Sequence, residues 1–244
     1  MSGPIKFPWI DNEVGATRGS LIKMQAQAAE GFYYAASNGQ TAIADSGATA
    51  YSATAATLLI QNNNPLPGQQ QQANALADGA PVNIYVDYIR LMAATAGSAA
   101  SGLSQIAFAL YLDNILRYSS GGTALTPANM NSYSPSASGA QIYFGTVVAK
   151  AANAAKAAVG MASMRPTVSG TAIGVVSDQY VLDCGATEGG MGGSIAPANP
   201  VMLSIPLPPI VIPPQCSAML SLWYPGGATM VAPTWLPEIG FWER

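Results

Sequence analysis

Short β-prone runs separated by turn residues recur along most of this chain, and they constrain its fold more than any other feature. In the clearest run, residues 82–92, the polar residues Asn83, Asp87 and Arg90 interrupt an apolar set that comprises Val82, Ile84, Val86, Tyr88 and Leu91. Such alternation is typical of a strand with one buried face. A second apolar run, residues 104–113, is predicted to be its long partner strand.

Turn signals divide the rest of the chain in the same way. Ser37-Asn38-Gly39 predicts a hairpin that joins residues 32–34 to residues 41–43. Further strands are predicted at residues 57–61, 142–148, 172–184, 201–205 and 217–224. Loops are predicted at residues 67–78, 118–140 and 185–193, which are rich in Gly, Ser, Asn, Gln or Pro.

Many short strands, long loops and few helical segments predict an all-β fold. We expect residues 31–244 to form one antiparallel domain, a sandwich or a jelly roll. No repeat with a period of roughly 20 to 50 residues is visible, which argues against a propeller or a solenoid.

One segment carries conflicting signals. The alanines and two lysines between Ala149 and Met164 favour a helix by intrinsic propensity. The strands on either side favour instead two strands joined by a turn near Asn153. The sequence alone leaves both alternatives open.

Residues 1–30 hold prolines and charges and show no sustained alternation. We expect them to form an extended N-terminal arm on a neighbouring subunit, since exposed aromatic groups on a free tail would be costly. Residues 20–30 can form a short helix. The candidate assembly contacts of the arm are Phe7, Trp9, Ile10, Leu21 and Met24.

Charge is scarce in this chain. Half of its residues are hydrophobic and only 9% are charged, against roughly 25% in an ordinary soluble domain. We expect such a chain to keep much of its surface against other protein. The nine basic residues are dispersed and the net charge is -3, so no stretch can neutralise several phosphates at once. The sequence therefore predicts no nucleic-acid partner.

The residue types needed for common enzyme chemistry are missing. The chain has no histidine, the usual acid–base group near neutral pH and the commonest metal ligand. It has no Gly-x-Ser-x-Gly elbow, and its glycine-rich segment lacks the phosphate-binding spacing. Cys184 and Cys216 match no zinc or redox spacing, and two buried free thiols are the favoured interpretation. We expect no enzyme activity, no metal and no cofactor.

The acidic residues do not suggest a glycosidase, which needs two carboxylates facing each other across a cleft. Asp87 and Asp113 can be cross-strand neighbours, but nothing else marks a cleft around them. Two local ion pairs, Asp87 with Arg90 and Asp113 with Arg117, are the simpler interpretation.

No membrane partner is predicted. Residues 91–112 carry no charge, but glycines, serines and a glutamine interrupt their apolar character near the middle. The first residues lack the long apolar stretch of a signal peptide.

The C-terminal part of the chain is its most distinctive region. Five prolines within residues 206–214 exclude a central strand and indicate a stiff edge or a sheet-crossing segment. The aromatic-rich end, residues 235–244, is predicted to be a strand fixed in a sheet.

The run LPPIVIPPQCSAMLSLWYPGG, followed by the terminal IGFWER, resembles the C-terminal strands of jelly-roll head proteins of tailed bacteriophages, of the decoration or cement type. Proteins of that family form trimers that sit on the outer capsid and clamp neighbouring capsomers. The resemblance implies an antiparallel jelly-roll sandwich, to which residues 1–30 add the extended N-terminal arm. It also implies a trimeric virion protein, made in the host cytoplasm, that contacts the major capsid protein on the capsid exterior.

Two other functions fit the same pattern. The first is a carbohydrate- or receptor-binding virion protein, for which Trp223, Tyr224 and Trp235 are the candidate residues, although their spacing favours core packing. The second is a capsid shell subunit, against which the lack of a basic inner face argues.

Overall fold

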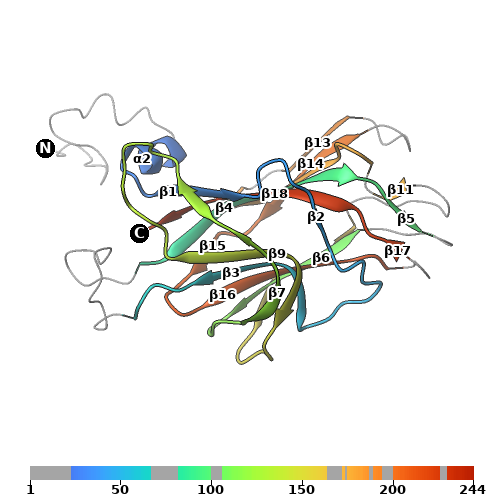
Figure 1. Ribbon diagram of the computed structural model, residues 1–244, viewed down its shortest axis with the longest axis horizontal. Coiled ribbons are helices and arrows are strands. Elements are labelled where there is room, and N and C mark those ends of the chain that lie inside the picture. Colours follow the sequence, from blue (N-terminus) through green and yellow to red (C-terminus); the bar gives the residue numbers. More distant parts are fainter. Residues whose placement is uncertain are drawn as a thin grey trace, which may run out of the picture.

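The computed structural model describes residues 23–66, 82–99, 106–163, 172–173, 175–186, 189–193, 200–225 and 230–244. Within these residues the chain is almost entirely β-structure, and the one helix, α2 (Lys23–Ala29), has seven residues. Two large sheets pack face to face (Figure 1). The predicted all-β sandwich is therefore confirmed.

Most strands belong to these two sheets. The nine-stranded sheet contains β13 (Gly190–Gly193), β14 (Val201–Leu207), β12 (Gln179–Cys184), β4 (Ile84–Thr95), β18 (Thr234–Glu243), β1 (Tyr33–Ser37) and β8 (Pro127–Asn129) in this order, with β15 (Ile210–Ile212) on β4 and β2 (Ile43–Ala44) on β18. The six-stranded sheet contains β10 (Lys156–Ser163), β6 (Ala107–Asp113), β16 (Ser217–Trp223), β3 (Ala55–Asn62), β9 (Ala140–Ala149) and β7 (Tyr118–Leu125). A small third sheet contains β11 (Ala172–Ile173), β5 (Gly97–Ala99) and β17 (Met230–Val231).

The strand order is that of a jelly roll. Eight strands pair antiparallel as a folded hairpin, first with last and so on inward: β1 with β18, β3 with β16, β4 with β12 and β6 with β10. β18 also pairs with β4, and β16 with β6, so the pairs join into two sheets. Eight strands in two packed sheets with this order form two Greek keys. Strands β7 to β9 lie between the fourth and fifth strands and extend the sheet edges.

The main core lies between the two sheets. Its largest members are aromatic and fully buried, and all but Tyr224, which follows β16, lie in strands of the two layers: Phe108, Phe144, Tyr180, Tyr224, Trp235 and Phe241. Burial of apolar area at roughly 25 cal/mol per Å² is the main source of stability in such a core. Smaller clusters cover the outer side of the six-stranded sheet, where Tyr51 packs against Tyr111 and Trp223. All seven residues of β16 are consequently buried.

The predictions for the C-terminal region are confirmed, except that Pro206 lies in β14, between β13 and β12. β18 lies between β4 and β1 in the nine-stranded sheet, so the aromatic end of the chain is fixed in a central strand. The proline-rich segment forms the short β15 on the edge of β4 and then crosses to β16 in the other sheet. The prolines beside β15 cannot donate to a further strand, which blunts this edge.

Two predicted strand pairings are wrong. β1 and β2 do not form a hairpin, because both pair antiparallel with the ten-residue β18 and therefore run in the same direction along it. The turn at Asn38 and Gly39 shifts the chain along that strand instead of reversing it. β6 does not pair with β4 either, since consecutive strands of a jelly roll alternate between sheets and β6 lies in the opposite layer.

The predicted inner face of the 82–92 strand is correct except at Tyr88. The β4–β18 pairing shifts register between Gly240 and Phe241. Gly240 pairs with Tyr88 and Phe241 with Val86, so β4 has one extra residue, Asp87, at this point. Such a bulge changes the phase of the alternation. Val86 and Ile89 consequently point into the core, while Asp87 and Tyr88 are only partly buried.

The ambiguous alanine-rich segment consists of strands. β9 ends at Ala149 and β10 begins at Lys156, and the turn between them contains Asn153. Tertiary contacts override helix propensity here, because β10 pairs with β6 and the backbone N–H groups of Asn153 and Ala154 donate to Asp113. Two predicted loops also contain strands: β7 and β8 lie within residues 118–140, and β13 lies within residues 185–193.

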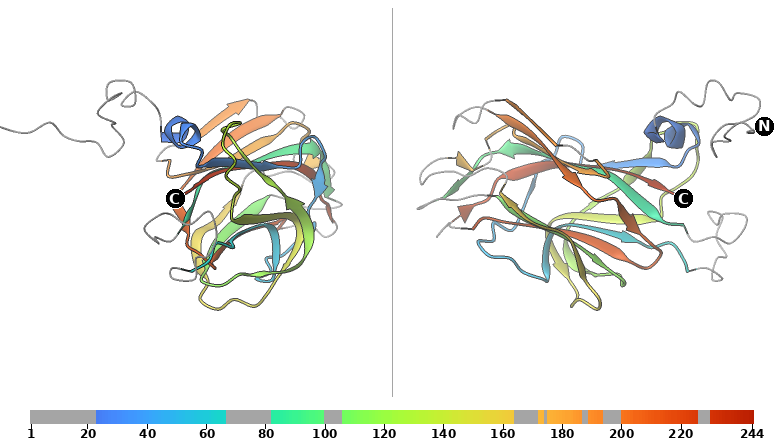
Figure 2. Two further views of the ribbon diagram at one scale, coloured as in Figure 1. Left: turned by 60° about the vertical axis from the view of Figure 1, so that its left-hand side comes forward. Right: turned by 180° about the vertical axis from the view of Figure 1, so that it is seen from behind.

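The helix predicted at residues 20–30 is present as α2. It lies over the outer side of the nine-stranded sheet near β1 (Figure 2). The Glu30 carboxylate lies 3.5 Å from the Arg244 guanidinium, which joins the end of this segment to the C-terminus of the chain. The rest of the predicted arm, residues 1–22, and the predicted loop 67–78 lie outside the described residues.

Candidate functional site

Only one of the five predicted assembly contacts lies within the described residues. Met24 is 39% exposed in α2, and its sulfur lies 3.7 Å from the Tyr33 hydroxyl. Phe7, Trp9, Ile10 and Leu21 lie outside the described residues. The role of these five residues in assembly stays a prediction.

Exposed apolar side chains gather where α2 meets the loop after β8. Met24, Met130 and Tyr133 are 39%, 47% and 95% exposed. The loop is held to α2 because the Asn131 side-chain amide donates to the Ala29 carbonyl at 3.1 Å and that of Asn129 donates to Gly31 at 2.9 Å. We call Met24, Met130 and Tyr133 the α2 corner. Sequence inspection missed its loop half because residues 118–140 read only as a polar connection.

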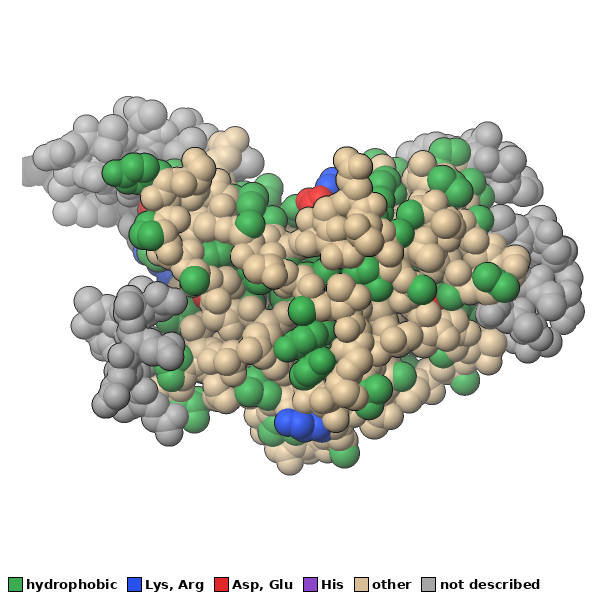
Figure 3. Space-filling view, viewed as in Figure 1, with side chains coloured by type: hydrophobic (Ala, Val, Ile, Leu, Met, Phe, Trp, Pro, Cys, Tyr) green, Lys and Arg blue, Asp and Glu red, His purple; other side chains and the backbone are tan. Residues whose placement is uncertain are grey.

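Several of the few charged residues lie inside the protomer. Asp45, Asp113, Arg117, Asp178 and Glu243 are all buried. Each one fixes a loop: the Asp178 carboxylate accepts from the backbone N–H groups of Val175 and Val201, and that of Glu243 accepts from Gly139 and Ala140. The surface is therefore poorer in charge than the composition alone suggests. On the face shown in Figure 3, charged side chains form only a few small spots.

Two of these buried carboxyls have pKa values that move in opposite directions. Burial raises the pKa of Asp45 above its ordinary value, although Tyr224, Gly47 and Trp235 donate hydrogen bonds to it. Burial acts in the same direction on Asp113, but the N–H groups of Ala154, Asn153 and Asn114 and the Arg117 guanidinium outweigh it and lower its pKa. Asp113 is thus held as an anion, whereas Asp45 takes up a proton more readily than an ordinary aspartate.

These opposite shifts predict opposite pH dependences. A carboxyl whose folded pKa is raised keeps its proton in the folded state after the unfolded chain has lost it at about pH 3.9. Asp45 therefore stabilises the fold less as the pH rises from that value through its folded pKa. Asp113 stabilises the fold above about pH 3.9 and loses that contribution as the pH falls through its lowered pKa.

Chemical denaturation at a series of pH values checks this prediction. We expect Asp45→Asn to remove a decline of unfolding free energy with rising pH, and Asp113→Asn to remove a decline at acid pH. Profiles of both variants that run parallel to the wild type would contradict the assignment.

The aromatic residues first considered for carbohydrate binding lie in the interior. Trp223 is 8% exposed, and Tyr224 and Trp235 are completely buried. The Trp235 indole and the Tyr224 hydroxyl both donate to Asp45. Their spacing therefore reflects core packing, as the sequence favoured.

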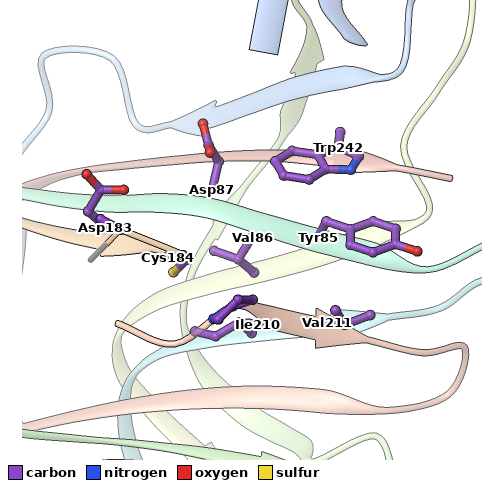
Figure 4. Close-up of a pocket in the computed structure, with 11 residues that line it drawn as sticks. Tyr85, Val86, Asp87, Asp183, Cys184, Ile210, Val211 and Trp242 are labelled. Carbon is purple, nitrogen blue, oxygen red and sulfur yellow. The ribbon is translucent and has the colours of Figure 1, made fainter. Parts of the chain in front are cut away.

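A different group of side chains lines a pocket on the outer face of the nine-stranded sheet. Its volume is about 390 Å³, and it lies where β12 ends and β15 begins along one edge of β4 (Figure 4). Tyr85 and Trp242 lie opposite each other on β4 and β18, with parallel rings whose centroids are 5.5 Å apart. Asp87 and Asp183 lie further along the same pocket, beside Cys184.

The position of Tyr85 was a signal for this pocket in the sequence. It stands between Asn83 and Asp87, in the outward phase of a strand whose other outward residues are polar. An aromatic residue at such a position marks either a covered face or a binding surface. The contribution of Trp242 was not predictable, because it depends on the distant pairing of β4 with β18.

The chemistry of this pocket does not suggest a nucleophile. Burial, together with the nearby Asp87 and Asp183 carboxylates, raises the pKa of the Cys184 thiol to about 12. The thiol is therefore protonated at neutral pH, and a thiol in that state is a poor nucleophile. Cys184 and Cys216 are both free, as the favoured interpretation held, but each is only partly buried.

The predicted ion pairs are half correct. Arg117 pairs with Asp113 at 2.9 Å, but Arg90 pairs with Glu238 rather than with Asp87, which accepts from the Tyr33 hydroxyl. Asp87 and Asp113 are not cross-strand neighbours, because their strands belong to different sheets. Among the described residues, no group of three or more acidic or cysteine side chains is placed to hold a metal ion.

In the part of the chain that the structure describes, no helix is both long and apolar enough to span a membrane. Comparison of the chain with protein-family models, with curated proteins and with solved structures finds no match, so a proposal for its function must come from its own sequence and geometry.

Proposed function

We propose that this chain is a structural virion protein that assembles with copies of itself, as a trimer, and decorates the outside of a capsid by contacting the major capsid protein. The jelly-roll order of its strands supports this, since viral capsid and lectin domains share that architecture. A fold alone does not define a function. The surface of the molecule supports the proposal more specifically.

The placement of the charges carries the proposal. Five charged residues are buried as loop clamps, so the exterior keeps little of the charge that normally separates copies of a soluble protein. Close contact between two such surfaces desolvates few ions and avoids the penalty that makes buried charges costly. A surface of this kind suits permanent packing against other protein.

The α2 corner is the contact that the geometry favours. Tyr133 is 95% exposed beside the exposed Met130, and hydrogen bonds to α2 fix their loop in place. Aromatic and methionine side chains are enriched at protein interfaces, where a preformed loop loses little entropy on binding. The corner also contains Met24, a residue of the predicted arm, so one interface can include both.

Light scattering on the purified full chain tests the proposal. We expect a particle of three chain masses at micromolar concentration. The double variant Met130→Ser/Tyr133→Ser should weaken association by at least about tenfold, equivalent to about 1.4 kcal/mol. Met202→Ser is the matched control, because Met202 is 52% exposed on β14, and it should leave the trimer intact.

The alternatives give different results in the same experiment. A stable monomer at micromolar concentration would overturn self-assembly. Spontaneous formation of closed shells would identify a capsid shell subunit instead. Co-sedimentation of the trimer with capsids that lack it tests the decoration role, and a trimer that never binds them would contradict that role while leaving self-assembly in place.

A further inference from the structure

We propose that the outer-face pocket lined by Tyr85, Trp242, Asp87 and Asp183 binds a neutral carbohydrate. The inference does not rest on the assembly role, because the pocket lies within one protomer. Its volume of about 390 Å³ falls in the range of small-ligand sites, roughly 300–1,000 Å³.

The aromatic pair supplies a flat apolar surface. The rings of Tyr85 and Trp242, on β4 and β18, are stacked, with planes that differ by 5° and centroids 5.5 Å apart (Figure 4). Tyr85 is partly exposed and Trp242 is 8% exposed within the pocket. A sugar ring has one face made of C–H groups, and that face can pack on an aromatic surface while the hydroxyls project outward. Tyrosine and tryptophan combine an apolar ring with a polar O–H or N–H group, so they suit contacts that are partly apolar and partly solvated.

The carboxylates supply hydrogen-bond acceptors at the end of this surface. An ionised carboxylate accepts only, and a hydroxyl donating to it forms a short, charge-assisted bond. The Tyr33 hydroxyl donates to Asp87 Oδ2 at 2.8 Å, which holds that carboxylate in position. The register of β12 on β4 places the second carboxylate, that of Asp183. Asp183 pairs with Tyr88 and follows the core residue Leu182, so its side chain lies on the side of the sheet away from the core.

The charge of the pocket selects the class of sugar. Two carboxylates line it, and no lysine or arginine is among its lining residues. After burial, both carboxylates contribute to the raised pKa of the Cys184 thiol in the same pocket. A sialic acid, a uronic acid or a phosphate would be repelled. A neutral hexose chain satisfies the acceptors without adding charge, which favours it over acidic glycans.

Two sheet features keep the site rigid. The neighbouring Gly240 allows the Tyr33 and Tyr88 side chains to converge, since a Cβ there would lie 2.5 Å from the Tyr33 hydroxyl and 2.3 Å from the Tyr88 ring. Pro209 fixes the chain that enters β15 on the other side of the pocket. Preformed sites lose less free energy on binding.

Binding of defined probes tests the proposal. Maltohexaose, cellohexaose and chitohexaose serve as neutral sugars, sialyllactose as an acidic sugar and penta-lysine as a basic peptide, each titrated into the full chain with NMR detection. We expect at least one neutral hexasaccharide to bind and sialyllactose not to bind. Tyr85→Ser and Asp183→Asn should each weaken that binding by at least about tenfold. Circular dichroism confirms that each variant is folded.

Tyr51→Ser is the matched control, because Tyr51 is an exposed aromatic residue on the outer side of the opposite sheet. It should leave sugar binding unchanged. Absence of binding by all three neutral sugars, or binding that survives Tyr85→Ser, would overturn the proposal. Binding of penta-lysine with no sugar binding would also overturn it and identify a site for basic peptides. None of these outcomes depends on the oligomeric state.

Discussion

Replacing Arg117 by alanine is expected to lower the free energy of unfolding by about 3–5 kcal/mol, as for other buried ion pairs that lose one partner. The Arg117 guanidinium joins three segments: it pairs with Asp113 at 2.9 Å and donates to the carbonyls of Lys150 at 2.7 Å and Ala53 at 2.9 Å. The side chains of Arg117 and Asp113 are both only 2% exposed. Alanine would leave two carbonyls without these donors and a cavity among three loops.

The size of this loss depends on how much of it is electrostatic. Asp113 keeps three backbone N–H donors after the change, from Asn114, Asn153 and Ala154, so its carboxylate remains hydrogen-bonded. Arg117→Met should therefore recover part of the loss by filling the cavity. Denaturant unfolding at fixed protein concentration measures both variants, since self-association would otherwise change the apparent stability.

The exposed ion pair provides the control. Arg90 and Glu238 are paired, but their side chains are 45% and 30% exposed. Arg90→Ala should cost no more than about 1 kcal/mol, as is usual for surface pairs. Equal losses for Arg90→Ala and Arg117→Ala would show that burial does not distinguish the two pairs, and the clamp role of Arg117 would fail.

The local features of the fold were predictable because they depend on residues that are adjacent in the sequence. The alternation at 82–92, the prolines at 206–214 and the aromatic end at 235–244 each predicted a strand or a crossing that the structure contains. Each depends on a period of two or on the chemistry of proline, and neither needs a distant partner. The strand pattern left a sandwich or a jelly roll open, and a resemblance of the C-terminal strands favoured the jelly roll.

Pairing partners were not predictable, because they depend on residues far apart in the chain. β4 pairs with β18, about 150 residues later, and the register shift at Gly240 decides that Tyr88 faces outward. The alanine-rich segment shows the same limit, since its strand β10 exists only beside β6. Helix propensity differs by less than about 1 kcal/mol per residue among ordinary residues, and a paired strand outweighs it.

The candidate pocket shows which part of a site a sequence can reveal. An outward aromatic residue at Tyr85 is visible in the alternation, and so is Asp87 beside it. The two other members come from β18 and β12, which the fold brings to either side of β4. The sequence drew attention instead to Trp223, Tyr224 and Trp235, because clustered aromatic residues look alike whether they are exposed or buried.

Truncation of Trp235 is expected to have an effect of similar size to that of Arg117. The indole is completely buried, packs edge-on against the Tyr180 ring at 5.8 Å, and donates from Nε1 to Asp45 Oδ2 at 3.0 Å. Trp235→Ala removes the largest fully buried side chain of the core. We expect a loss of about 3–5 kcal/mol in the free energy of unfolding, the usual range for buried tryptophan.

Trp235→Phe separates packing from hydrogen bonding at this position. Phenylalanine keeps most of the apolar contact with Tyr180 but removes the donor to Asp45, so we expect a loss of about 1–3 kcal/mol at neutral pH. The loss should shrink toward acid pH, where a protonated Asp45 needs fewer donors. Tyr224→Phe removes the other side-chain donor to the same carboxylate and should show the same pH trend. A loss for Trp235→Phe that stays constant with pH would mean that packing alone accounts for it, and that the bond to Asp45 contributes nothing.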